Sequence, residues 1–111
     1  MAESNIIGGN QIASSQIGIL KGSLTGTTAG TVYYYQINLG GVKTFVAVFN
    51  GYENDTTTNQ TITFPIAYVN APTVIAGNST LPTLSASTTA LTITAPDATT
   101  VYSGTAIVSG F

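Results

Sequence analysis

The sequence predicts an all-β protein, a six-stranded antiparallel β-sandwich with an extended N-terminal arm. Apolar and polar residues alternate from residue 31 onward, which is the period of a strand. Short apolar segments recur roughly every ten residues and are separated by Gly, Pro, Asn and Asp, a spacing typical of sandwiches. No segment keeps a helical period over several turns, so no helix is expected.

The first two predicted strands form a hairpin. Residues 31–39 (TVYYYQINL) are β-branched and aromatic, and Gly40-Gly41 supplies the turn after them. The second strand, residues 42–52 (VKTFVAVFNGY), has a centre at residues 45–49 that is apolar on both faces. A strand of this kind is expected to be covered on both sides.

Four further strands complete the predicted sandwich. Polar loops are expected at residues 54–60 and 77–87, and a turn at 96–98. Pro65 and Pro72 are expected at strand ends, bulges or sheet edges, because proline cannot donate a hydrogen bond to a neighbouring strand. The four strands are expected at residues 61–66 (TITFPI), 73–76 (TVIA), 89–95 (TALTITA) and 101–111 (VYSGTAIVSGF).

Residues 1–30 differ from the domain predicted at residues 31–111. They are rich in Gly and Ser, contain scattered aliphatic residues and have no aromatic one. We therefore expect an extended attachment arm. Its aliphatic residues are too many for a solvent-exposed linker, so they are expected to pack against a partner protein or to intertwine within an assembly. The attachment candidates are Ile6, Ile7, Ile12, Ile17, Ile19 and Leu20.

The composition excludes several classes of function. The chain has no His, Cys or Arg, so disulfides, thiolate nucleophiles, Ser-His-Asp triads and the usual zinc or iron sites are not expected. Two lysines provide no basic surface for a phosphate backbone, which argues against nucleic-acid binding. No cofactor is expected, and we interpret the chain as not being an enzyme.

The scarcity of charged residues bears on whether the chain associates. Charged residues make up 5% of the chain, against roughly 25% in an ordinary soluble domain. Every apolar segment is interrupted well before the roughly 18 residues of a membrane span, and the start lacks the basic and apolar regions of a signal peptide. Because charge normally keeps soluble monomers apart, we expect a chain that is packed within an assembly.

Tyrosines are the main candidates for ligand contact. Tyr33 and Tyr35 share one face of their strand, and there packing is favoured over stacking on a sugar ring. Tyr52, Tyr68 and Tyr102 lie nearer to predicted loops and strand ends, where a saccharide could be met, but packing is favoured for each of them too.

An oxygen-rich loop begins after the second predicted strand, and Asn54 and Asp55 are further candidates for saccharide contact. Its carboxylates and amides also suit Ca²⁺, but the order of an EF-hand is absent and a solvated loop is favoured. A glycosidase would need two acids at a defined separation, for example this loop and Asp97, and is disfavoured because such spike enzymes are much larger. We therefore expect no metal site and no catalytic residue.

Four groups of residues follow one another in a recognisable order. They are NGYEN at 50–54, QTITFP at 60–65, AY with APTV between 67 and 74, and a closing IVSGF at 107–111. In this order, residues 43–111 resemble the small C-terminal domains of phage and prophage tail fibres, which are related in fold to H-type lectins. The resemblance implies a sandwich that assembles as a parallel homotrimer, with an N-terminal segment attached to other virion proteins and host-surface saccharides bound at the tip.

These observations lead to three hypotheses of function. The first is a virion structural protein, assembled in the host cytoplasm, that forms a trimeric spike or fibre tip and contacts host-surface glycans. The second is a capsid decoration or head-fibre protein that stabilises the particle or aids surface adhesion, since 111 residues leave no room for a long fibre shaft. The third is a cellular or prophage surface-assembly protein without a ligand.

Overall fold

The computed structural model describes residues 6–7, 10–11, 17–54, 58–77, 80–94 and 100–111, and within them the protein is all-β without a helix. A five-stranded sheet has the order β3-β4-β5-β10-β7, and a three-stranded sheet has the order β6-β9-β8. The strands are β1 (Ile6–Ile7), β2 (Asn10–Gln11), β3 (Ile17–Thr25), β4 (Ala29–Leu39), β5 (Val42–Glu53), β6 (Gln60–Thr63), β7 (Thr73–Ala76), β8 (Thr83–Ala86), β9 (Ala90–Thr94) and β10 (Tyr102–Gly110).

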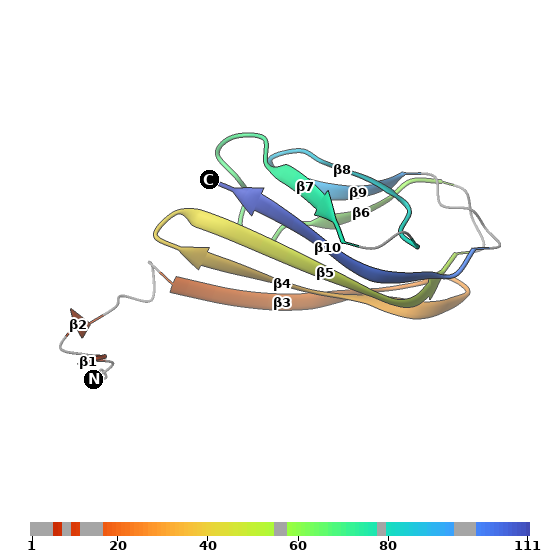
Figure 1. Ribbon diagram of the computed structural model, residues 1–111, viewed down its shortest axis with the longest axis horizontal. Helices are drawn as coiled ribbons and strands as arrows, with labels where there is room; N and C mark the ends of the chain where they lie inside the picture. The colour runs from red at the N-terminus through yellow and green to blue at the C-terminus, as the bar shows by residue number, and fades with distance from the viewer. Residues whose placement is uncertain (1–5, 8–9, 12–16, 55–57, 78–79, 95–99) are drawn as a thin grey trace.

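All strand pairs are antiparallel, and the two sheets face each other (Figure 1). The small pair of β1 and β2 lies apart from both sheets, beyond the end at which β3 begins (Figure 1). The all-β prediction with antiparallel sheets is therefore confirmed. The number of six strands is wrong, because the two sheets contain eight strands among the described residues.

The predicted hairpin at residues 31–52 is present as β4 and β5. Gly40 and Gly41 turn the chain with φ angles of 60° and 91°, which only glycine adopts without strain. Asn38 helps to close the turn, because its side-chain oxygen accepts a hydrogen bond of 3.1 Å from the backbone N–H of Gly41. The hairpin supplies the two longest strands of the molecule and thereby the centre of the larger sheet.

The core lies between the two sheets and follows from the alternation along the strands. On β5, Phe45, Ala47 and Phe49 are buried, whereas Val46 and Val48 face away from the core. The smaller sheet contributes Leu91 and Ile93 from β9, both without exposed surface. Burial of each large side chain contributes about 1.5–3 kcal/mol relative to its exposure, so these alternating positions determine which face of each sheet turns inward.

Two strands of the facing sheets, β3 and β8, were not predicted because their sequences lack a clear alternation. β8 lies within residues 77–87, which were predicted to be a polar loop, and it forms an edge of the smaller sheet beside β9. β3 lies within residues 1–30, which were predicted to be an arm, yet it pairs with β4 over nine residues. The sheet therefore begins before the predicted domain boundary at residue 30.

Gly22 explains why β3 is hard to recognise. It lies opposite Tyr34 on the inward face of β4, and a Cβ atom added to Gly22 would come to 2.5 Å from the Tyr34 hydroxyl. The Tyr34 ring thus occupies space that a side chain on β3 would need, as when an aromatic residue covers a glycine on a neighbouring strand. Glycine at this position breaks the apolar alternation in the sequence while fitting the structure.

Gly30 is required where β4 passes close to β5. It has a φ angle of 72° and lies at an irregularity in the pairing, between Ala29 and Thr31. A Cβ atom added there would collide with the carbonyl oxygen of Gly51 and would lie 2.7 Å from that of Asn50. Both obstacles are backbone atoms, which cannot rotate away.

We expect Gly30→Ala to lower the free energy of unfolding by about 2–4 kcal/mol, because it combines an unfavourable backbone conformation with a collision. The matched control is Gly40→Ala. Gly40 also has a positive φ, but nothing lies within 4 Å of an added Cβ, so the expected loss is about 1–2 kcal/mol. Urea denaturation of the two variants checks this prediction, and equal losses would contradict it.

Candidate functional site

The tyrosines predicted to contact a saccharide belong to the core. Tyr52, Tyr68 and Tyr102 have exposed fractions of 1%, 4% and 9%, so none presents its ring to a ligand. The prediction that they form a contact surface is therefore wrong. Proximity to a strand end does not decide which way a side chain points, and these three point between the sheets. Packing, the interpretation that the sequence favoured, holds for all three.

Asn54 is also buried and has a structural role. Its side-chain N–H donates to the Tyr52 hydroxyl at 2.8 Å, and its side-chain oxygen accepts a hydrogen bond of 2.9 Å from the backbone N–H of Thr27. These contacts connect the end of β5 to the turn between β3 and β4. Asp55, the other candidate from this loop, lies outside the described residues.

Tyr68 connects the segment after β6 to the larger sheet. Its hydroxyl donates a hydrogen bond of 2.7 Å to the carbonyl oxygen of Val108 on β10. Burial raises the pKa of this phenol above its ordinary value of 10.0, since the phenolate would be poorly solvated, and the pKa of Tyr52 is raised for the same reason. The ammonium of Lys43, itself buried, lies 6.0 Å from the centre of the Tyr68 ring.

A second buried connection comes from Gln36 on β4. Its side-chain N–H donates to the carbonyl oxygen of Ile66 at 2.9 Å, and its side-chain oxygen accepts from the backbone N–H of the same residue at 2.6 Å. The side-chain amide of Gln36 thus pairs with both backbone groups of Ile66, as a neighbouring strand would. Buried amides are stable when paired in this way, so we assign Gln36 to the structure rather than to a site.

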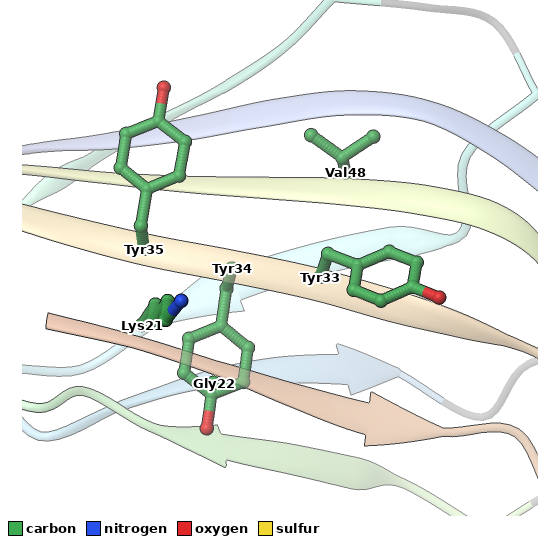
Figure 2. Close-up of a pocket in the computed structure, with 6 residues that line it drawn as sticks. All are labelled: Lys21, Gly22, Tyr33, Tyr34, Tyr35 and Val48. Carbon is green, nitrogen blue, oxygen red and sulfur yellow. The ribbon is translucent and has the colours of Figure 1, made fainter.

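The exposed tyrosines are Tyr33 and Tyr35 on β4. They alternate with the inward-facing Tyr34, and Figure 2 shows Tyr35 and Tyr34 on opposite sides of the strand. Tyr33 and Tyr35 have exposed fractions of 54% and 40%. They belong to a groove of about 550 Å³, which we call the tyrosine groove. Its lining residues are Lys21, Gly22, Tyr33, Tyr34, Tyr35 and Val48.

The chemistry of the tyrosine groove is predominantly apolar. Among the described residues that line it, the polar groups are the ammonium of Lys21 and the tyrosine hydroxyls, and none is a carboxylate. Acid–base hydrolysis of a glycoside requires two carboxyl groups, so the groove is not equipped for that reaction. Among the described residues, no three side chains of the His, Cys, Asp or Glu types gather as metal ligands. The groove suits an apolar or aromatic group.

The groove is part of a larger surface, the side of the five-stranded sheet that faces away from the core, which we call the outer face. One row of paired residues crosses all five strands. Tyr35 is opposite Lys21 on β3 and Val46 on β5, and Val46 is opposite Ile107 on β10. Ile107 is opposite Ile75 on β7. Apart from Lys21 at one edge, this row is apolar from strand to strand.

The candidates for attachment do not form one group in the structure. Ile6 and Ile7 form β1, while Ile17 and Ile19 lie in β3, opposite Leu39 and Ile37. In the same strand Leu20 is 43% exposed. Ile12 lies outside the described residues. Candidates expected in a single arm are thus divided between the small β1–β2 pair and an edge of the larger sheet.

The outer face could have been anticipated in part from the sequence. The segment at residues 45–49, apolar on both faces, indicated that more surface is covered than one core requires, and the structure places Val46 and Val48 outward. The residues on β7 and β10 that continue this surface could not be assigned, because the order of strands in the sheet was unknown. Pairing across the sheet is what joins them.

Comparison with known proteins finds no matching protein family, no matching curated protein and no matching solved structure. Among the described residues, no helix is long and apolar enough to cross a membrane.

We expect Tyr68→Phe to lower the free energy of unfolding by about 1 kcal/mol at neutral pH, because the hydrogen bond to Val108 is lost. The dependence of the free energy of unfolding on alkaline pH should also change in this variant. The raised pKa of Tyr68 in the folded state means that its contribution is complete below the ordinary value of 10.0 and is lost as the pH rises through the folded value.

The stability of the wild type should therefore decline above pH 10, and that of Tyr68→Phe should decline less steeply. Denaturant unfolding at neutral pH and at two pH values above 10 measures both slopes. Leu81→Ala provides a control, since it weakens packing against the core without removing an ionisable group. Parallel slopes for Tyr68→Phe and wild type would contradict the assignment.

Proposed function

We propose that this chain is a non-enzymatic structural protein of a virion, in which β-sandwich domains assemble as a homotrimer into a spike or fibre tip. The observation that carries the proposal is the outer face of the five-stranded sheet. It combines aromatic and aliphatic side chains from four strands, β4, β5, β10 and β7, in a protein that has very few charges. Such a face favours the association of several copies over the monomeric state.

Exposure on the outer face is concentrated in large side chains. Tyr33, Ile75 and Leu39 have more than half of their surface accessible, and Val48 and Ile107 more than a third. Soluble monomers rarely expose contiguous apolar patches of more than a few hundred Å². A function in which copies of the chain cover one another's apolar surface accounts for this distribution.

The non-enzymatic part of the proposal rests on residue types. Without His and Cys, and with four acidic residues in the whole chain, few groups are available for general acid–base or nucleophilic work. The described surface groove contains an ammonium and phenols but no carboxylate. A binding or structural role requires none of these groups.

The parts of the proposal that concern a virion and a fibre tip are based on the resemblance of residues 43–111 to tail-fibre tip domains. Two antiparallel sheets without a helix are compatible with that resemblance. In the proposed arrangement, the N-terminal residues attach to other virion proteins and the sandwich is distal. Contact with host-surface glycans is part of this proposal, with neither nucleic acid nor membrane as a partner.

A second candidate function is capsid decoration, in which the protein stabilises the particle or aids loose adhesion. It is favoured by a specific observation: Tyr52, Asn54, Tyr68 and Tyr102 are buried, so the glycan hypothesis loses most of its predicted contact residues. The tyrosine groove offers two exposed rings, but few polar groups surround them to bind the hydroxyls of a sugar. Decoration requires no such groups.

The proposal predicts that the protein in solution has three times the mass of the 11.3 kDa chain. Light scattering coupled to size-exclusion chromatography, over a hundredfold range of concentration, measures this mass. A monomer at every concentration would contradict the proposed assembly. The same preparation should be applied to a glycan array and to host cells.

Glycan binding by the assembled protein would support the fibre tip. Particles that lose stability when the gene is deleted, together with an assembly that binds no glycan, would support capsid decoration instead. A matched control for the array is Tyr33→Ser combined with Tyr35→Ser, which removes both exposed rings. Retention of glycan binding by this variant would place the saccharide elsewhere on the molecule.

A further inference from the structure

We propose that the outer face of the five-stranded sheet is the surface on which copies of this chain bind one another, with the tyrosine groove receiving an apolar side chain of the neighbouring copy. This inference rests on the proposed assembly and assigns its contact surface. The larger sheets would face the common axis, and the three-stranded sheets would face outward.

The apolar surface is continuous across the sheet. The row from Tyr35 through Val46 and Ile107 to Ile75 joins four neighbouring strands, and the hydroxyl of Tyr35 is its one polar group. Tyr33 and Val48, which are paired with each other, extend the apolar surface along β4 and β5. A sheet in contact with water on one side normally carries polar residues on that side. On the outer face this central row is apolar instead, while the rows beside it also contain Thr, Ser and Asn.

Charged groups on the outer face lie toward its margins. They are the ammonium of Lys21 on the edge strand β3 and the carboxylate of Glu53 at the last residue of β5, and the remaining polar groups are the amide of Asn50 and the hydroxyl groups of Ser and Thr. The central region of β4, β5 and β10 has no charge to be left unpaired on association, and burial of an unpaired charge is what most opposes an interface. Depletion of charge with enrichment of Tyr is typical of interface centres.

The area of the outer face is compatible with an interface. The four long strands β3, β4, β5 and β10 span about 14 Å across and about 30 Å along nine residues, and the four residues of β7 add a strip of about 13 Å, which gives roughly 500 Å² for the flat sheet. Projecting side chains make the accessible area larger. A stable interface of standard size buries about 800 Å² per partner. The accessible area of the outer face is thus of the order that association between copies requires.

The tyrosine groove favours a protein side chain over a saccharide. A saccharide site needs several polar groups that bind hydroxyls, whereas this groove is lined by the rings of Tyr33 and Tyr35, the methyl groups of Val48 and the aliphatic stem of Lys21. These surfaces match the side chains that the outer face itself projects, such as Ile75 and Leu39. A second copy of the chain therefore supplies both the apolar side chains that fit the groove and the surface area that an interface needs.

We expect Val48→Glu to reduce association at least a hundredfold, because a carboxylate would lie unpaired in an apolar interface. The control is Val69→Glu, which places the same charge at a residue that is 77% exposed and lies outside the five-stranded sheet. Sedimentation velocity gives the mass of each variant, and far-UV circular dichroism establishes that each is folded.

Dissociation of Val48→Glu alone is the expected result. If the wild type is assembled and Val48→Glu remains assembled, this inference is overturned while the proposed function stands. If the wild type is a monomer, the assembly in the proposed function fails and this inference fails with it.

A second measurement avoids a disruptive substitution. The chain has no Cys, so Val48→Cys and Val69→Cys each introduce a single thiol. In the assembled protein, we expect a maleimide reagent to modify the thiol at position 48 at least tenfold more slowly than the thiol at position 69. Equal rates in an assembly of confirmed mass would overturn the inference, since Val48 is already 38% exposed in the single chain.

Discussion

Phe45 stands at the centre of a series of ring contacts on which the packing of the two layers depends. Its ring centre lies 5.4 Å from that of Tyr34 on the neighbouring strand and 5.0 Å from that of Phe64, which follows β6. Phe64 contacts Tyr68 at 5.0 Å, and the Tyr68 hydroxyl bonds back to Val108 on β10. Residues 64–68, which follow β6, are thus attached to the larger sheet at two points. Phe64 packs against Phe45, and Tyr68 donates its hydrogen bond to Val108.

The same strand that buries Phe45 also exposes Val46 and Val48, and this links the stability of the core to the surface of the molecule. Because side chains alternate along a strand, a segment that is apolar at every position must present an apolar face on each side of its sheet. One side of β5 is covered by the smaller sheet. The other side forms the middle of the outer face, for which we propose neighbouring copies as the cover.

Much of the fold could be predicted from local patterns, but the candidate site could not. The hairpin of β4 and β5 follows from its apolar residues and the Gly40-Gly41 turn, and both of its strands were found. β3 was missed because Gly22, which accommodates the ring of Tyr34, interrupts its pattern. Tyr52 and Tyr102 were candidates for ligand contact because they lie near strand ends, although packing was favoured, and their orientation toward the core depends on sheet pairing that no local pattern contains.

The sequence by itself determined an all-β protein with antiparallel strands, a chain with little charge, and the absence of the residue types on which most catalysis depends. These follow from composition and from a period of two, which are local properties. Only the tertiary structure decided that Tyr33, Val48, Ile107 and Ile75 share one surface. They come from the hairpin of β4 and β5 and from two strands, β7 and β10, that are distant from it in the chain, and the hydrogen bonds between strands, rather than any sequence motif, bring them together.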